Sequence, residues 1–385
     1  MQYLLNKKLI LHISHTDIRY DSRILKELKS LQLLKDKTIN ALGIEDRINK
    51  NKKYNSNELK IDTVHLKSKS LLFIPRVFLY FLNFIEANII FSFKILLLRP
   101  KIIHCHDTFL LPSAVLNNII LGSIIFYDAH ELESDKNGQS YILSKITLLI
   151  EKVCWSRISL LISVSKSIIN WYEYNIGNKR SEVILNSPEI SEFKKNLNAN
   201  NNYLRSKYKI PKNSKIFIYV GLLSKGRNIE TLLKLFSENE IRDHLVIIGE
   251  GILSKLVKKF SEKNENIHFH INVPHYELVE LLKECDIGLC LIENVSLSDY
   301  YCLPNKLFEY MFAGLHVLAS DFPEINLLSQ EYDSISLCKA DKRLLKSKIR
   351  KLINQKIKKY SNPYEEISWN YQTKKLYLAY KQFID

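Results

Sequence analysis

The chain has 385 residues, 46% of them hydrophobic, so it can bury a full core in each of two or three domains. A formal net charge of +15 suits anionic membranes or phosphorylated substrates as partners, whereas a nucleic-acid binder is a distant alternative because no nucleic-acid motif stands out. The six cysteines form no C-x-x-C pair, which excludes a disulfide framework and predicts buried thiols in a reducing, cytoplasmic compartment.

In the first half of the chain, short apolar runs alternate with segments of helical periodicity. The runs predicted as strands are 9–14, 61–66, 102–106, 123–127, 160–164 and 183–186. Helical periodicity lies between them, for example at 23–34 and 142–155. This alternation predicts a parallel sheet with helices on both faces.

Polar residues follow the first of these strands, at the sheet edge where α/β proteins bind ligands. A Gly-rich turn is absent there, and Asp21 instead stands at the N-cap position of a helix that Ser22 and Arg23 open. Capping alone accounts for Asp21. Arg23 could reach a diphosphate or an acceptor substrate, so both residues are candidates for the acceptor or cleft region.

Histidines and carboxylates follow two further strands. His104 and His106 share one face of their strand, and Asp107 stands at its tip. A zinc site there is conceivable, but hydrogen-bonded histidines are the simpler interpretation, since no fourth ligand at metal spacing is evident. His130 and Glu131 follow the strand at 123–127 and point to the same edge.

The most apolar region of the chain spans 71–98. Arg76, Glu86 and Lys94 interrupt it, so it lacks a charge-free run of about eighteen residues and is not expected to span a bilayer. The simpler interpretation is a pair of buried helices. The alternative is an amphipathic surface, rich in Phe, Leu and Ile, that rests on an anionic membrane interface.

A polar, Asn-rich stretch at 192–202 has the composition of a linker. A second alternation follows it, with predicted strands at 216–220, 245–248, 267–270, 287–292, 316–319 and 335–338. The simplest fold is therefore α/β with two Rossmann-like domains, whose parallel sheets face a central cleft. The expected domains are 1–190 and 191–365, followed by a C-terminal aromatic helix at 366–385.

Two glycine-bearing turns open the second half. In the loop after the strand at 216–220, Gly221 and Gly226 would let the backbone approach a ligand, while Lys225 and Arg227 would neutralise a diphosphate. A solvated basic turn is the alternative interpretation of this loop. The turn that holds Gly249 and Gly251 follows the next strand, and any tight strand-to-helix turn would look alike.

The segment 303–324 predicts a loop, a short helix, a glycine stop and a buried strand. Pro304 suits the first helical position, and Gly314 suits the residue just past the helix end. Asn305, Lys306 and Glu309 share one helical face, and the helix N-terminus offers free N–H groups to a phosphate. Phosphate at the tip with a sugar diol near Glu309 describes a nucleotide-sugar site.

This segment, "LPNKLFEYM.AG..V.ASDFPE", resembles the donor-binding helix of the group 1 (family 4) glycosyltransferases, which have the GT-B fold. The resemblance extends over nearly the whole chain and is most specific at 215–324. It implies that Asn305, Lys306 and Leu307 bind the donor with the two glycine turns, and that Glu309 and Arg227 are catalytic. His130 matches a histidine that lies against the transferred sugar, and the C-terminal helix crosses back onto the first domain.

The resemblance further implies a retaining, metal-independent transfer with no cofactor beyond a nucleotide-diphosphate sugar. The expected acceptor is a glycan or lipid-linked glycan in bacterial cell-surface polysaccharide synthesis. Two positions depart from the family pattern: Leu222 stands where a cation is usual, and Tyr301 where the first of two carboxylates is usual. Lys225 could replace the missing cation. The departures keep two alternatives open, a non-catalytic partner in glycan assembly and a nucleotide-sugar epimerase or hydrolase.

Overall fold

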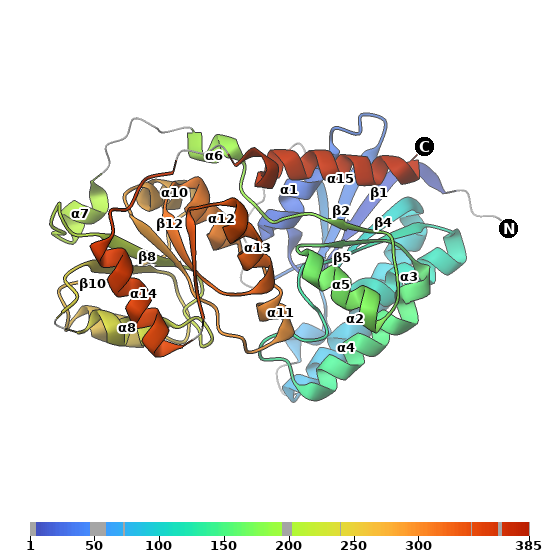
Figure 1. Cartoon of the computed structure of the whole chain (residues 1–385). Helices are drawn as coiled ribbons and strands as arrows, with labels where there is room; N and C mark the ends of the chain where they lie inside the picture. Colours follow the sequence, from blue (N-terminus) through green and yellow to red (C-terminus); the bar gives the residue numbers. More distant parts are fainter. Residues whose placement is uncertain are drawn as a thin grey trace. The chain divides into compact units, whose positions relative to one another are not determined.

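The computed structural model describes residues 5–46, 59–71, 74–194, 202–238, 240–339, 341–360 and 364–384 (Figure 1). The chain forms two compact units. Unit 1 comprises Met1–Leu185 together with Gln372–Asp385, and unit 2 is the continuous segment Asn186–Tyr371. The divisions thus fall after Leu185 and after Tyr371, whereas the sequence placed them after 190 and after 365.

Unit 1 is built on a parallel sheet of seven strands in the order β3-β2-β1-β4-β5-β6-β7. The strands are β1 (Asn6–Ile13), β2 (Thr38–Ile44), β3 (Lys60–Val64), β4 (Pro100–His106), β5 (Ile124–Ala129), β6 (Ile158–Ser163) and β7 (Ser181–Val183). The parallel sheet confirms the prediction, but the sequence missed β2. Asn40 and Gly43 interrupt the apolar pattern of that strand, although Asn40 is buried and Gly43 packs closely against Thr16.

The helices of unit 1 are α1 (Ser22–Leu31), α2 (Arg76–Leu98), α3 (Leu111–Leu121), α4 (Tyr141–Cys154), α5 (Lys166–Asn175) and the greater part of α15 (Trp369–Ile384). Short 3₁₀ turns lie at Ile18–Tyr20, Ser68–Ser70, Thr108–Leu110 and Trp155–Arg157. The order of the strands reverses between β1 and β4. A doubly wound sheet binds ligands at such a point, outside the carboxyl ends of the strands.

Region 76–98 forms one helix, so the interpretation as a pair of buried helices is wrong. Ala87, Phe91 and Ile95 are fully buried at a four-residue spacing, while much of the opposite face is exposed. No proline or glycine breaks the helix, and Glu86 accepts hydrogen bonds from the backbone of Lys67 and Ser68, each at 2.8 Å. Among the described residues, Val77–Leu98 is the one stretch of helix long and apolar enough to cross a membrane, judged by length and composition.

Unit 2 contains a parallel sheet of six strands in the order β10-β9-β8-β11-β12-β13. The strands are β8 (Ile216–Val220), β9 (His244–Ile248), β10 (Ile267–His270), β11 (Ile287–Cys290), β12 (His316–Ser320) and β13 (Ile335–Cys338). Each strand predicted in this half is present within two residues of its expected ends. The order reverses between β8 and β11, which directs attention to the loops that follow these two strands.

The helices of unit 2 are α6 (Ile190–Lys194), α7 (Tyr203–Lys207), α8 (Ile229–Phe236), α9 (Ser254–Ser261), α10 (His275–Lys283), α11 (Leu297–Tyr300), α12 (Asn305–Phe312), α13 (Pro323–Glu331) and α14 (Lys342–Asn354), with a 3₁₀ turn at Glu365–Ile367. An apolar core joins β8, β9 and β11 to α8 and α14, and includes Phe217, Leu232, Leu245, Leu289 and Ile349. The predicted linker at 192–202 begins inside α6, and most of it lies outside the described residues.

Candidate functional site

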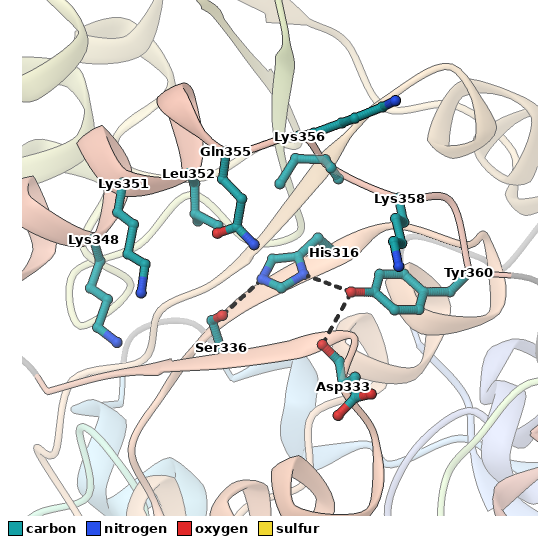
Figure 2. Close-up of a pocket in the computed structure, with 11 residues that line it drawn as sticks. His316, Asp333, Ser336, Lys348, Lys351, Leu352, Gln355, Lys356, Lys358 and Tyr360 are labelled. Carbon is teal, nitrogen blue, oxygen red and sulfur yellow. Dashed lines mark hydrogen bonds between the residues drawn. The ribbon is translucent and has the colours of Figure 1, made fainter.

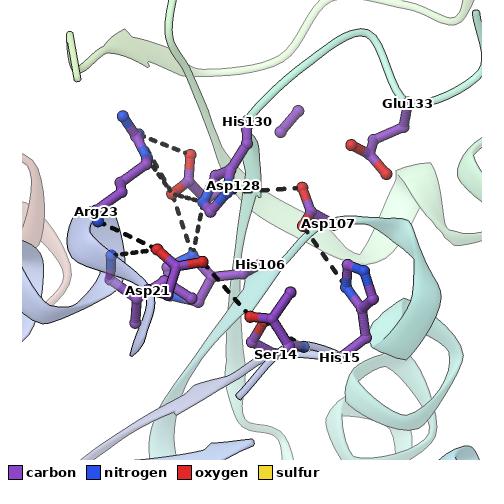
Figure 3. A network of polar contacts seen from close by, with 12 residues as sticks. Ser14, His15, Asp21, Arg23, His106, Asp107, Asp128, His130 and Glu133 are labelled. Atoms are coloured by element: carbon purple, nitrogen blue, oxygen red, sulfur yellow. Dashed lines mark hydrogen bonds and ion pairs between the residues drawn. The ribbon is translucent and has the colours of Figure 1, made fainter. Parts of the chain in front are cut away.

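The polar residues that follow β1, β4 and β5 gather at the carboxyl edge of the unit 1 sheet (Figure 3). Asp21 is the N-cap of α1 and accepts hydrogen bonds from the backbone N–H groups of Arg23 and Ile24, each at 3.1 Å. Such a cap satisfies helix donors that would otherwise lack a partner. The role that the structure gives to Asp21 is therefore the capping of α1.

Arg23 points into the protein, toward Asp128, and not toward a substrate (Figure 3). Its guanidinium lies 3.0 Å from Asp128 and 3.1 Å from Glu27, and it donates to the carbonyl of Ile184 at 2.9 Å. Burial opposes its charge, but Asp128 and Glu27 hold its pKa above the ordinary value. The prediction that Arg23 reaches a diphosphate or an acceptor is thus wrong, since all of these contacts are buried.

Four imidazoles form what we call the histidine column: His12, His104, His106 and His130. The rings of His12 and His104 stack at 4.3 Å between centroids, and those of His104 and His106 at 4.4 Å. Hydrogen bonds of 3.0 Å join His12 Nδ1 to His106 Nε2 and His106 Nδ1 to His130 Nε2. At the inner end, Tyr380 Oη of α15 lies 2.5 Å from His104 Nδ1 and 3.3 Å from His12 Nε2.

The two ends of the histidine column differ in charge. Burial lowers the pKa of His104 to about 3 and that of His106 to about 4, and it also lowers the pKa of His12 well below the ordinary value. Burial opposes the charge of His130 as well, but the carboxylates of Asp107 and Asp128 outweigh it and raise the pKa of His130 to about 10. At neutral pH His130 is therefore a cation that donates hydrogen bonds, and it cannot act as a general base.

The charge of His130 gives both of its ring nitrogens a proton to donate. A neutral imidazole donates from one ring nitrogen and accepts at the other. His130 Nε2 lies 3.0 Å from both His106 Nδ1 and Asp128 Oδ2, and His106 Nδ1 lies 3.2 Å from that same carboxylate oxygen. The order of donors and acceptors along the column therefore depends on the tautomer of His106. With either tautomer, the Tyr380 hydroxyl links His12 to His104, so one side chain of α15 completes a hydrogen-bonded chain that ends at His130.

The remaining acidic residues of this cluster divide into buried and exposed ones. Asp107 is buried at a positive φ of 61°, and its carboxylate lies 3.6 Å from His15 Nδ1 and 3.9 Å from His130 Nδ1. Burial opposes its charge, but His130, Lys136 and His15 hold its pKa below the ordinary value. Glu131 is exposed, whereas Glu133, which the sequence did not single out, is buried 2.5 Å from Lys136.

Donor atoms of His12, Glu27, His104 and His106 lie within 4.8 Å of one another, a spacing that could hold a metal ion, and His106, Asp128 and His130 form a second such group. In the first group the guanidinium of Arg23 already supplies positive charge, 3.1 Å from Glu27. His12 and His106 also hydrogen-bond each other. These contacts favour hydrogen-bonded histidines over a metal centre, and the absence of a catalytic metal stays a prediction.

In unit 2, two glycine turns pack backbone against backbone at the carboxyl ends of β8 and β9. Gly249 has a φ of 153°, and a Cβ there would lie 1.9 Å from the carbonyl oxygen of Gly221. Gly251 has a φ of 156°, and a Cβ there would lie 2.4 Å from the carbonyl oxygen of Leu223. Hydrogen bonds from Gly221 N to Ile248 O and from Leu223 N to Glu250 O join the turns. The role that the structure gives to Gly249 and Gly251 is close loop packing.

Arg227 is held in the loop after β8 by a residue that the sequence analysis missed. Its Nη1 lies 2.9 Å from Asp299 Oδ1, and this carboxylate raises the pKa of Arg227 although burial opposes it. Ser296 fixes Asp299 in turn, because its hydroxyl accepts from Asp299 N and donates to Asp299 Oδ2, each at 3.1 Å. The Ser-x-x-Asp spacing of a capping box could have revealed Asp299. Lys225 and Leu222 are exposed in the same loop.

Helix α12 presents Lys306 and Glu309 from its first turns. Lys306 Nζ lies 4.1 Å from the centre of the Tyr219 ring, and burial, opposed by Cys290 and aided by Arg227, lowers the pKa of Lys306 to about 8. Glu309 Oε1 lies 3.5 Å from His275 Nε2 of α10, and both Lys306 and Glu309 are half-buried. Arg227 disfavours the charge of Lys306, whereas Asp299 stabilises the charge of Arg227, and an anion beside Lys306 would offset the cost of its burial.

The structure agrees with the sequence analysis at some of the other residues of α12 and differs from it at others. Asn305 is exposed at the helix start. Leu307 lies in the core and its N–H donates to the carbonyl of Pro304 at 2.9 Å, so neither its side chain nor its N–H is free for a donor. Pro304 is the N-cap residue and not the first helical residue. Gly314 has a φ of 80° just past the helix end, as predicted.

One part of the chain, which lies within unit 2, matches the model of a described family. Residues 200–368 match the family model "Glycosyl transferases group 1". The "Putative colanic acid biosynthesis glycosyl transferase WcaI" of Escherichia coli (strain K12) is 22% identical over 209 residues, 52% of this chain and 50% of that protein. The chain thus spans about half the length of the curated relative it matches.

Solved structures resemble nearly the whole chain. Sucrose-phosphate synthase from Thermosynechococcus elongatus gives a TM-score of 0.71 at 14% identity, covering 98% of this chain and 96% of that one. Anabaena Alr3699/HepE in complex with UDP-glucose gives a TM-score of 0.67 at 12% identity, covering 98% and 95%. These likenesses confirm the predicted fold, two parallel-sheet α/β units of the GT-B type.

Proposed function

We propose that this chain transfers a sugar from a nucleotide-diphosphate sugar to a hydroxyl of a glycan or lipid-linked glycan, because residues 200–368 match the model of the group 1 glycosyl transferases. The observation that carries the proposal is the pair of neighbouring cations, Arg227 and Lys306, at the carboxyl edge of the unit 2 sheet. A diphosphate between them would remove their mutual repulsion. Unit 2 would bind the donor and unit 1 the acceptor, in the synthesis of a cell-surface polysaccharide.

The proposed reaction retains the configuration at the sugar C1 and needs no metal. The bond from C1 to the phosphate oxygen breaks while a bond from C1 to the acceptor oxygen forms on the same face. The acceptor proton leaves with the departing phosphate. Arg227 and Lys306 would stabilise the negative charge that develops on this phosphate, and Glu309 would accept hydrogen bonds from sugar hydroxyls. His130 would donate a hydrogen bond toward the sugar, as a cation can.

The first test is calorimetric titration with nucleoside diphosphates and their sugar conjugates, in the presence of EDTA. We expect one base to bind selectively, and Arg227→Ala and Glu309→Ala to weaken its binding. Lys258→Ala removes an exposed cation of the same unit on α9 and is the matched control. If no nucleotide binds the wild type, or if Arg227→Ala binds as the wild type does, the donor site is wrong.

A second measurement separates transfer from the alternatives of the same fold. Product analysis with and without an acceptor glycan should show donor consumption that depends on the acceptor. Equal consumption without an acceptor would identify a nucleotide-sugar hydrolase or epimerase. Binding without turnover under any condition would instead favour a non-catalytic partner in glycan assembly.

We further infer that unit 1 rests on an anionic membrane through α2, α3 and α4, which pack side by side (Figure 1). Their exposed large apolar residues are Val77, Phe78, Tyr80, Phe81, Leu82, Ile85, Ile89, Phe93, Leu97, Leu116, Ile119, Ile120, Tyr141, Ile142, Ile146, Leu149 and Val153. Apolar surfaces of this extent are rare on monomeric proteins in water. Lys94, Lys145 and Lys152 lie on α2 and α4, as suits an anionic interface.

Flotation with vesicles that contain an anionic lipid tests this contact. The wild type should float at low salt, and Phe78→Glu combined with Ile89→Glu should remain in the soluble fraction, because both side chains are exposed on α2. Ile252→Glu combined with Ile271→Glu changes two equally exposed apolar residues of unit 2 and should float like the wild type. A wild type that does not float would exclude the membrane contact.

A further inference from the structure

A second polar cavity lies within unit 2, apart from the candidate donor site (Figure 2). It has a volume of about 360 Å³ and is lined by the start of β12, the second half of α14 and the segment that follows α14. His316 is the first residue of β12, so the cavity opens at the amino edge of the sheet. Arg227 and Lys306 follow carboxyl ends, and the five residues of β12 span about 16 Å between the two edges.

The walls of this cavity carry four lysines. Lys348 and Lys351 belong to the second half of α14, and Lys356 and Lys358 to the segment after it. In the part of the chain that the structure describes, none of these four ammonium groups forms an ion pair. Asp333 is the one acidic residue among those lining the cavity, so the walls carry a clear excess of positive charge.

The floor of the cavity is fixed and uncharged. The Tyr360 hydroxyl donates to the backbone carbonyl of Asp333 at 3.2 Å and lies 3.4 Å from His316 Nδ1 (Figure 2). Since that hydroxyl has one proton, it accepts from His316 Nδ1–H, and His316 Nε2 accepts from Ser336 Oγ–H at 2.8 Å. Burial lowers the pKa of His316, which keeps the ring neutral. The side chains of His316, Ser336 and Tyr360 therefore add no negative charge, and the Asp333 carboxylate is the one acidic group in the described lining and faces four lysines.

We propose that this cavity binds a compact anion that carries phosphate groups. Ammonium groups form short, charge-assisted hydrogen bonds with phosphate oxygens, and their flexible stems let several converge on one ligand. The four lysines are exposed, so water and salt screen their mutual repulsion, and a bound phosphate relieves it most at low ionic strength. Inorganic diphosphate and the headgroup of an anionic phospholipid share this chemistry.

Calorimetric titration with inorganic pyrophosphate at low salt tests the site. The titration is made in an Arg227→Ala background, so that the candidate donor site does not contribute. We expect Lys348→Ala combined with Lys351→Ala to weaken pyrophosphate binding about tenfold or more. Lys342→Ala combined with Arg343→Ala removes the same charge from the start of the same helix, outside the cavity lining, and should leave the affinity unchanged.

A vesicle experiment separates the two sources of phosphate. Sedimentation with phosphatidylglycerol vesicles is measured as a lipid titration with Phe78 and Ile89 unchanged, because the Phe78→Glu and Ile89→Glu variant is itself expected not to bind vesicles. A loss of vesicle binding specific to Lys348→Ala with Lys351→Ala identifies a lipid headgroup as ligand, and a loss confined to pyrophosphate identifies a free phosphate. If the cavity variant and the Lys342 control behave alike in both measurements, the proposal is overturned. Nucleotide-sugar binding is measured separately, so failure here leaves the proposed function untouched.

Discussion

Burial and the neighbouring Arg227 lower the pKa of the Lys306 ammonium toward neutral pH. Its pKa is lowered to about 8, so the side chain is charged below that pH and neutral above it. In a nucleotide-diphosphate sugar the two phosphates are esterified at both ends, so each has only one strongly acidic proton, which is already lost at pH 7. Between pH 7 and pH 9 the charge of Lys306 therefore changes, and the charge of the diphosphate does not.

We expect the affinity for the nucleotide donor to fall up to about tenfold from pH 7 to pH 9, as Lys306 loses its proton. Lys306→Arg should flatten this dependence, because a guanidinium stays charged throughout. Titration calorimetry at several pH values measures both. A wild type with the same affinity at pH 7 and pH 9 would show that Lys306 does not contact the ligand through its charge.

Gly249 tests whether the two glycine turns serve loop packing. Gly249→Ala would place a methyl group 1.9 Å from the carbonyl oxygen of Gly221, so we expect a loss of about 3 kcal/mol or more in the free energy of unfolding. Gly221→Ala is the control, because Gly221 also has a positive φ, of 130°, but a Cβ there would lie no closer than 4.0 Å to a neighbouring atom, so only backbone strain of about 1–3 kcal/mol should appear. Chemical denaturation measures both. Equal losses would refute the packing role.

Among the elements, α15 carries the contact that completes the histidine column. Tyr380→Phe should destabilise the protein by about 1–3 kcal/mol, because it leaves buried nitrogens of His104 and His12 without a partner. Tyr371→Phe makes the same change on the exposed side of the same helix and should have little effect. Denaturation in urea measures the difference. If the two variants are equally stable, the hydroxyl of Tyr380 contributes nothing to the column.

Helices and strands whose ends are marked by nearby residues could be predicted from the sequence. The contacts of residues whose partners are distant in the sequence could not. Gly314 and the apolar run of β12 mark the end of α12 and the strand after it within a dozen residues. Nothing near Arg23 reveals its pairing with Asp128, which lies 105 residues away. Tyr380 is likewise 276 residues from His104. The chemistry of unit 1 is therefore fixed by tertiary contacts that no local pattern contains.

Helix α2 shows that the sequence also fails to predict which apolar side chains are exposed. Its apolar composition predicts burial, but the buried face consists of the stripe around Ala87, Phe91 and Ile95, and the rest is exposed. The composition of a helix gives the amount of its apolar surface, but it does not tell how many neighbouring elements cover that surface. The strand β2 illustrates the converse, since Asn40 and Gly43 are buried in spite of a weak apolar pattern.

For the whole molecule, two units with separate cores predict two unfolding transitions in scanning calorimetry. A ligand stabilises only the unit that binds it, by about 2.7 kcal/mol at 100 times its dissociation constant. The nucleotide donor should therefore raise the transition temperature of unit 2 and leave that of unit 1 unchanged. A single transition, or an equal shift of both, would show that the units unfold together.

Unit 2 is one uninterrupted stretch of chain, and its two ends meet: Trp369 N donates to the carbonyl of Pro188 at 2.9 Å. In genetic terms this makes it an insertion within the gene segment that encodes unit 1. Recombination could therefore replace the whole stretch with two junctions at neighbouring points, without a change to any residue of the histidine column. Under the proposed function, such a replacement would exchange the donor specificity and leave the acceptor specificity unchanged.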